Sequence, residues 1–119
     1  MGRRDVTDSA TGTIFPIQNQ IVSSVDALAG NGVFTSNPVS NLNARRIVGS
    51  AFADQAGVLS FEMSDDGVNW EAFTTTVTVG VSTYATFDQI IYSALVRLVY
   101  TNGAAANTIF RLSACTYPY

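Results

Sequence analysis

Hydrophobic and polar residues alternate along the stretch from Phe52 to Phe73, FADQAGVLSFEMSDDGVNWEAF. Leu59, Phe61 and Met63 fall on one side of an extended chain, and the residues between them fall on the other. A period of two predicts a half-buried antiparallel strand. The Asp-Asp-Gly at 65–67 predicts a tight turn, because Asp bonds to nearby backbone and Gly adopts positive φ. The stretch therefore predicts a strand, a turn and a return strand.

From Gly32 onward, short β-branched or aromatic segments are separated by turn residues. Strands at a spacing of about 8 to 12 residues are typical of sandwiches and jelly rolls. We therefore expect an all-β domain over 32–119, a single antiparallel β-sandwich of jelly-roll-like form. The expected strands are Val33–Thr35, Arg45–Phe52, Val58–Met63, Asn69–Phe73, Thr75–Val79, Thr83–Phe87, Leu95–Tyr100 and Thr108–Tyr117.

Residues 1–31 show no sustained period, and Pro16 opposes a helix across that point. A short helix over 18–29 is the weaker alternative. Apolar residues in such a segment need a surface to cover them, either on their own domain or on a neighbour. We expect an extended N-terminal arm over 1–31 that binds a partner through Arg3, Arg4, Ile14, Phe15, Ile17, Ile21 and Val22.

The last two expected strands predict a closing hairpin. With Leu98 opposite Phe110, Arg97 would lie opposite Arg111 on the outer face. Facing like charges are unfavourable unless an acid compensates them. Glu62 is one candidate acid and a residue of a neighbouring subunit is the other, whereas a register shifted by two would separate the arginines. The expected core is Leu59, Phe61, Val77, Leu98, Phe110 and Leu112, with Trp70 close to it.

Charge is sparse on this chain. Charged residues make up 13% of it, against about 25% in a typical soluble domain, and all basic residues are arginine. A surface this neutral suits a protein packed against neighbours, and a small hydroxyl-rich β domain is the alternative. The net charge of −3 argues against nucleic acid as the partner.

Cysteine and hydropathy add two exclusions. Cys115 is the single cysteine, so an intrachain disulfide is excluded. No apolar run is long enough to cross a membrane, and the polar, charged start from Met1 to Ser9 does not resemble a signal peptide. We therefore expect neither a membrane partner nor a secreted host protein.

Catalytic chemistry has few residues to use. Without His, the usual general base and the usual metal cluster are missing. Two carboxylates can make a glycosidase pair, and Asp65, Asp66 and Asn69 are candidates for a calcium site. Asp beside Gly is better explained as a turn former, so we expect no enzyme activity, metal or cofactor. The carboxylates considered are Asp54, Glu62, Asp65, Asp66, Glu71 and Asp88.

One motif joins two turns. Its Asp-Gln-x-Gly part consists of Asp54, Gln55 and Gly57, and its Ser-x-Asp-Gly-x-x-Trp part contains Asp65, Asp66, Gly67 and Trp70. The combination resembles small β-sandwich proteins of bacteriophage virions, of the capsid decoration (cement) type. The resemblance extends loosely to LVRLVYTNGAAANTIFRLSA near the C-terminus.

This resemblance implies a non-enzymatic structural protein. Its partners would be the outer surface of the major capsid protein shell and neighbouring copies of itself, as a homo-oligomer on a virion assembled in the host cytoplasm. Its work would be mechanical, because buried interface area raises the cost of separating capsomers. Glu62, Arg97 and Arg111 would supply outer-face charges. The alternative is a glycan-binding or adhesion module of a phage tail or fibre, with Trp70 stacked on a sugar.

Overall fold

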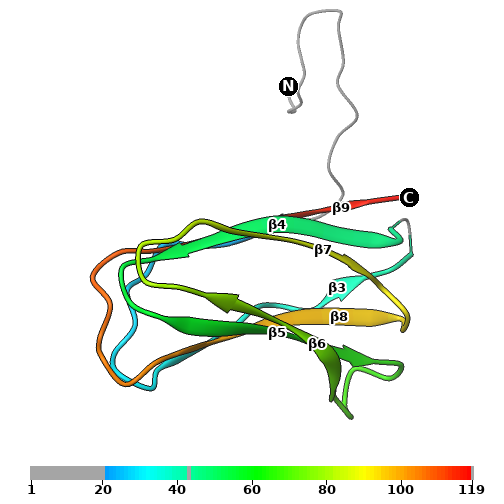
Figure 1. Cartoon of the computed structure of the whole chain (residues 1–119). Helices are drawn as coiled ribbons and strands as arrows, with labels where there is room; N and C mark the ends of the chain where they lie inside the picture. The colour runs from blue at the N-terminus through cyan, green and yellow to red at the C-terminus, as the bar shows by residue number, and fades with distance from the viewer. Residues whose placement is uncertain (1–20, 43, 119) are drawn as a thin grey trace, which may run out of the picture.

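The computed structural model describes residues 21–42 and 44–118. In this part of the chain, nine strands form two antiparallel sheets that pack face to face (Figure 1). The expected all-β sandwich is confirmed. The strands are β1 (Ile21–Ser24), β2 (Val33–Thr35), β3 (Val39–Ser40), β4 (Arg46–Ala53), β5 (Gly57–Ser64), β6 (Glu71–Val79), β7 (Ala85–Ile90), β8 (Leu95–Asn102) and β9 (Phe110–Tyr117).

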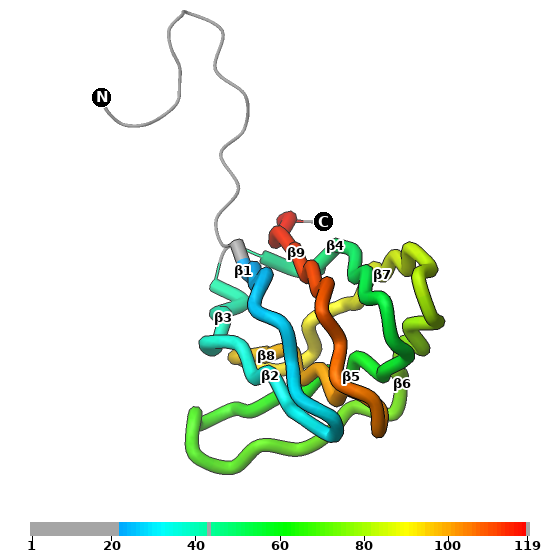
Figure 2. Tube along the Cα trace, turned by 90° about the vertical axis from the view of Figure 1, so that its left-hand side faces the viewer, coloured from blue at the N-terminus to red at the C-terminus, as the bar shows by residue number. Residues whose placement is uncertain are grey.

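One sheet has four strands in the order β1-β9-β4-β7. The other has five strands: its path runs β2-β8-β5-β6, and β3 also pairs with β8. Figure 2 shows β1, in blue, running beside β9, in orange and red. The central strands are therefore β9 and β4 in one sheet and β8 and β5 in the other.

Alternating side chains from the two sheets meet in a single core. On β9, Phe110, Leu112 and Ala114 are buried, and the residues between them face outward. The rings of Tyr100 on β8 and Phe110 on β9 lie 4.7 Å apart between centroids, joining the two sheets. Aromatic contacts of this kind add to the free energy of burial. The core residues predicted from the sequence are buried except Val77, which is partly buried and packs against the core: Leu59, Phe61, Leu98, Phe110 and Leu112.

The predicted closing hairpin is wrong. β8 pairs with β2, β3 and β5, whereas β9 pairs with β1 and β4 in the opposite sheet. Leu98 therefore lies opposite Phe61 within its own sheet, and the predicted pairing of Arg97 with Arg111 does not occur. The predicted inward faces of β8 and β9 are nevertheless confirmed, because both strands turn these faces toward the shared core.

Two strands, β1 and β3, lie where none was predicted, and β1 falls in the expected arm. β1 pairs with β9, and neither arm nor helix describes this segment. Val22 on β1 is only 6% exposed and belongs to the core, so its assignment to a partner-binding arm is wrong. The sandwich thus includes residues from Ile21 onward, and removing residues 1–31 would delete an edge strand. The expected arm residues Arg3, Arg4, Ile14, Phe15 and Ile17 lie outside the described residues.

The strand boundaries differ elsewhere by small amounts. The two strands expected over Asn69–Phe73 and Thr75–Val79 form the single long strand β6. Its pairing with β5 shifts in register between Ser60 and Glu62, which marks a bulge. A bulge bends a strand without ending it, so one strand carries both segments.

Phe110→Ala tests the position of the core. Phe110 is 2% exposed and packs against Tyr100, so its truncation should lower the free energy of unfolding by about 3–5 kcal/mol. Ile109→Ala is the matched control, because Ile109 is 44% exposed and should cost less than about 1 kcal/mol. Chemical denaturation measures both, and equal small losses would contradict this assignment of the inner face.

Candidate functional site

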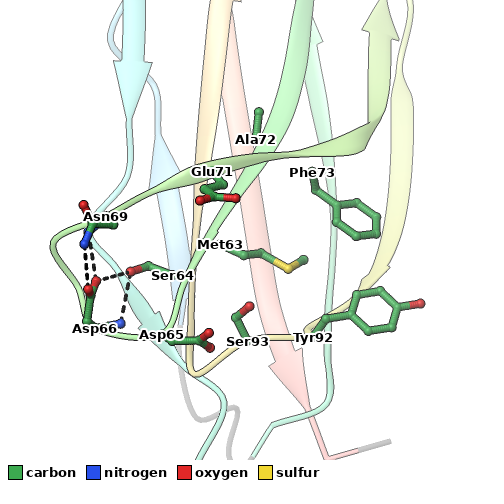
Figure 3. Close-up of a pocket in the computed structure, with 10 residues that line it drawn as sticks. All are labelled: Met63, Ser64, Asp65, Asp66, Asn69, Glu71, Ala72, Phe73, Tyr92 and Ser93. Carbon is green, nitrogen blue, oxygen red and sulfur yellow. Dashed lines mark hydrogen bonds between the residues drawn. The ribbon is translucent and has the colours of Figure 1, made fainter.

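A hollow of about 400 Å³ opens at the end of the sandwich, beside the connection between β5 and β6 (Figure 3). Its volume lies within the usual range of ligand sites, about 300–1,000 Å³. The β5–β6 turn, the start of β6 and the segment between β7 and β8 form its walls. We call it the hairpin hollow; its lining residues are Met63, Ser64, Asp65, Asp66, Asn69, Glu71, Ala72, Phe73, Tyr92 and Ser93.

The Asp66 carboxylate organises the turn on one side of the hollow. Its Oδ1 accepts hydrogen bonds from the backbone N–H groups of Asn69 and Val68, both at 2.8 Å, and from the Ser64 hydroxyl at 3.0 Å. Its Oδ2 accepts a bond from the Asn69 side-chain amide. These bonds, led by the Asn69 N–H, hold the pKa of the Asp66 carboxyl well below its usual range. Gly67 has φ of 77° in this turn, a conformation that favours glycine.

This network supports the turn interpretation over the calcium site. Both Asp66 oxygens already accept N–H bonds, and the Asn69 amide is turned toward Asp66 as a donor. Within residues 21–42 and 44–118, no group of three or more His, Cys, Asp or Glu side chains is placed to hold a metal ion.

Two other carboxylates of the hollow have few partners. Asp65 is exposed and accepts one long hydrogen bond, 3.5 Å from the Ala94 N–H. Glu71 is exposed at the start of β6. In Figure 3 both carboxylates and the Ser93 hydroxyl lie around the open space. They therefore offer acceptor oxygens to a ligand.

An aromatic pair forms the opposite wall. The rings of Phe73 and Tyr92 stack with their centroids 5.3 Å apart and 20° between their planes. Tyr92 is 64% exposed. Tyr92 was not predicted as a site residue, because it lies in a connection between strands and meets Phe73 only in the folded chain.

Next to the hollow, Trp70 lies against charged groups on the outer face of the five-stranded sheet. The Arg97 guanidinium lies 4.3 Å from the centre of a Trp70 ring and bonds to Glu62 at 2.7 Å. Glu62 and Arg97 are register partners on β5 and β8. Glu62, one of the two acids considered from the sequence as a partner for the arginines, thus pairs with Arg97. The prediction that Trp70 packs close to the core is wrong, because Trp70 lies against Arg97 and is not among the side chains packed on the core.

The same outer face carries two rows of uncharged side chains. Strand register places Val58 beside Thr101 and Thr78, with Val33 beyond Thr101. The next row is arranged in the same way around Ser60. We call this surface the neutral face; its residues are Val33, Thr101, Val58, Thr78, Thr35, Val99, Ser60 and Thr76.

The residues of the Asp-Gln-x-Gly motif have structural roles. Asp54 Oδ1 accepts the N–H groups of Thr108 and Ile109 at 3.0 and 3.1 Å, and Oδ2 accepts the Thr108 hydroxyl at 2.5 Å. These bonds, led by the Thr108 hydroxyl, lower the pKa of the Asp54 carboxyl. At Gly57, an added Cβ would lie 2.2 Å from the Tyr100 hydroxyl, so only glycine fits. Gln55 is partly buried beside them.

Three further charged side chains, those of Arg46, Asp88 and Arg111, lie on the four-stranded sheet. Arg111 stacks on Phe52, with 4.9 Å from its guanidinium carbon to the ring centre. Arg46 pairs with Asp88, and this bond lowers the pKa of the Asp88 carboxyl. Asp54, Glu62, Asp66 and Asp88 are thus each engaged in turns or ion pairs, which disfavours a glycosidase pair among them. None of the described residues forms a helix that could cross a membrane.

Residues 10–117 match the family described as the N-terminal domain of the uncharacterised protein YqxG. The chain belongs to this family. The family match therefore begins upstream of β1 and covers the whole sandwich of this YqxG N-terminal domain.

Two solved structures share the fold of this YqxG-family chain. The PBSX exported protein XepA is similar with a TM-score of 0.76 and 20% identity, over 87% of this chain and 40% of XepA. PirA is similar with a TM-score of 0.55 and 14% identity, over 78% of this chain and 92% of PirA. This chain thus spans less than half of XepA. No curated protein matches it in sequence.

Asp66→Asn tests the turn through its pH dependence. A carboxyl with a lowered pKa in the folded state stabilises the protein above its unfolded pKa and loses that contribution as the pH falls. The variant should melt below the wild type at neutral pH, and the gap should shrink from about pH 5 toward about pH 2.

Asp26→Asn is the control, since it removes the same charge from an exposed position outside this turn. Thermal unfolding followed by circular dichroism gives both gaps. A gap for Asp66→Asn that stays constant with pH would contradict the proposed stabilisation by the ionised carboxylate.

Proposed function

We propose that this chain is a non-enzymatic structural protein of a phage, and that its sandwich attaches to the outside of a capsid shell as a decoration protein. The neutral face is the observation that carries this proposal. The fold shared with the PBSX exported protein XepA supports the phage setting.

The neutral face has the chemistry of a protein-binding surface. Its two rows hold only Val, Thr and Ser, so a partner can cover them without stripping water from a charge. Charged residues are depleted in the cores of protein interfaces. β-Branched side chains also have few rotamers to lose on binding. A sheet face of this kind suits a flat partner such as a shell, where a standard interface takes about 800 Å² per partner.

A pre-formed cluster borders this face. Arg97 is held by Glu62 and stacked on Trp70, so its guanidinium is already ordered before binding. Arg and Trp are enriched among the residues that dominate interface energies. The ion pair also joins opposite charges, so this border of the neutral face carries no net charge.

The glycan-binding alternative depends on an open aromatic platform at Trp70. Arg97 covers one face of this ring at 4.3 Å, which supports protein attachment over sugar stacking there. Attachment needs no chemical step and no cofactor. In this proposal the protein is located on the virion surface, and its partners are the major capsid protein and adjacent copies of itself.

Val58→Glu tests this proposal. Val58 is 41% exposed at the centre of the neutral face, and a carboxylate there would be buried without a partner in the complex. We expect the affinity for empty shells of the encoding phage to fall by about tenfold or more. Co-sedimentation with increasing protein measures the affinity and the saturation level.

Ser113→Glu is the control, because it adds the same charge to an exposed outer position of β9 on the opposite sheet. It should bind like the wild type. A wild type without saturable shell binding would contradict decoration, and equal binding by the wild type and Val58→Glu would exclude the neutral face as the contact.

A further inference from the structure

We propose that the hairpin hollow binds a cationic side chain of a protein partner, the guanidinium of an arginine or the ammonium of a lysine. The proposal rests on protein attachment as the function. It adds the hairpin hollow to the neutral face as a second contact and names the chemical group that the hollow would bind. It does not depend on whether that partner is a capsid shell.

The electrostatics of the hollow favour a cation. Its lining contains three carboxylates, those of Asp65, Asp66 and Glu71, and no arginine. The guanidinium on the adjacent face belongs to Arg97, which is occupied by Glu62. A concave surface with one sign of charge concentrates the field and attracts the opposite charge. An anionic ligand is therefore disfavoured.

The hydrogen-bonding groups of the hollow are mostly acceptors. The Ser64 hydroxyl and the Asn69 side-chain amide both donate to the Asp66 carboxylate within the turn. Asp65 and Glu71 then remain with acceptor oxygens, beside the hydroxyls of Ser93 and Tyr92. A guanidinium has five N–H donors and no acceptor, and an ammonium has three donors and no acceptor. A neutral sugar presents donors and acceptors in similar number, so it matches this wall less well.

The aromatic wall completes the match. Tyr92 is 64% exposed and is held flat by its stack on Phe73, so a planar cation can lie against an ordered ring. Met63, at 6% exposure, supplies an apolar floor for the aliphatic part of an arginine or lysine side chain. The same combination of a cation, an aromatic ring and a carboxylate occurs on the adjacent face, where Arg97 stacks on Trp70 and pairs with Glu62.

The size of the hollow indicates how the cation arrives. A volume of about 400 Å³ falls in the range that takes whole small ligands. There is thus room for one basic side chain together with part of the peptide that carries it. We therefore infer a short basic segment of a protein as the ligand.

Titration of the full chain with small probes tests the site without any assembly. The probes are N-acetyl-arginine amide, N-acetyl-lysine amide and, as a neutral comparison, N-acetylglucosamine. Amide signals of Ala72, Ser93 and Ala94 in ¹⁵N-correlated NMR spectra report on the hollow. We expect saturable shifts with the cationic probes that weaken as salt is raised to about 0.5 M.

Two variants, each with a control, test whether the two carboxylates and the tyrosine ring bind the probe. Asp65→Asn combined with Glu71→Gln should weaken probe binding by about tenfold, while Asp26→Asn should leave it unchanged. Tyr92→Ala should weaken the arginine probe, and Tyr84→Ala is its control, because the two tyrosines are 64% and 66% exposed. The Asn/Gln replacements preserve side-chain shape, and all variants are checked for an unchanged spectrum outside the hollow.

Three results would overturn the proposal. They are an absence of saturable shifts with both cationic probes, stronger binding of the sugar than of the cations, or full affinity in the Asp65→Asn, Glu71→Gln double variant. None of these uses shells, so failure of the hollow and failure of shell attachment are separate outcomes. Probe binding at the hollow without shell attachment would keep the site and reject the decoration proposal.

Discussion

The fold depends on the crossing of the chain from one sheet to the other between β8 and β9. Asp54 binds the connection at Thr108 and Ile109, and Asn102 donates from its side chain to the carbonyls of Ala105 and Ala29, both at 2.9 Å. Asn102 is 2% exposed, so its amide would destabilise the fold if these bonds were missing.

The connection between β8 and β9 also binds the segment that follows β1. The Asn107 side-chain oxygen accepts the Leu28 N–H at 2.7 Å, and the Asn107 N–H donates to the Leu28 carbonyl at 3.0 Å. The segment after β1 is thereby tied to the connection between the two sheets. Crossing over brings Tyr100 and Phe110 together from opposite sheets, which closes the core. It also leaves each sheet with its own outer surface. One surface carries the neutral face, and the other carries Arg111 and the Arg46–Asp88 pair.

Local pattern explains why much of this architecture could be predicted. Alternation identified the β8 and β9 segments and their buried sides, because burial of every second residue leaves its mark on each strand separately. It could not identify the partner strand. Two amphipathic strands joined by 103–109 have the same pattern whether they pair as a hairpin or face each other across a sandwich. The bonds that hold the connection come from Asp54 and Asn102. Asp54 bonds to Thr108, which is far away in sequence, and Asn102 bonds to Ala105 within the connection.

In the candidate sites too, features formed by neighbouring residues could be predicted, and features formed by distant residues could not. The turn at Asp66 was predictable, because its bonds join residues two or three positions apart. The hairpin hollow was not, since Tyr92 and Ser93 reach it from a different connection than the residues of the β5–β6 turn. The neutral face depends on the register of β2, β8, β5 and β6, and register follows from long-range pairing. β1 was missed because its sequence IVSS shows no alternation, and its pairing with β9 joins residues far apart in the sequence.

The central claim is that the outer face of the five-stranded sheet attaches this protein to a phage shell. An electron cryomicroscopy map of empty shells saturated with the purified chain tests it most directly. The account predicts sandwich-shaped density at regular shell positions, with β5, β6 and β8 turned toward the capsid protein and the four-stranded sheet turned toward solvent. Shells without added density, or density in which the four-stranded sheet makes the contact, would contradict it.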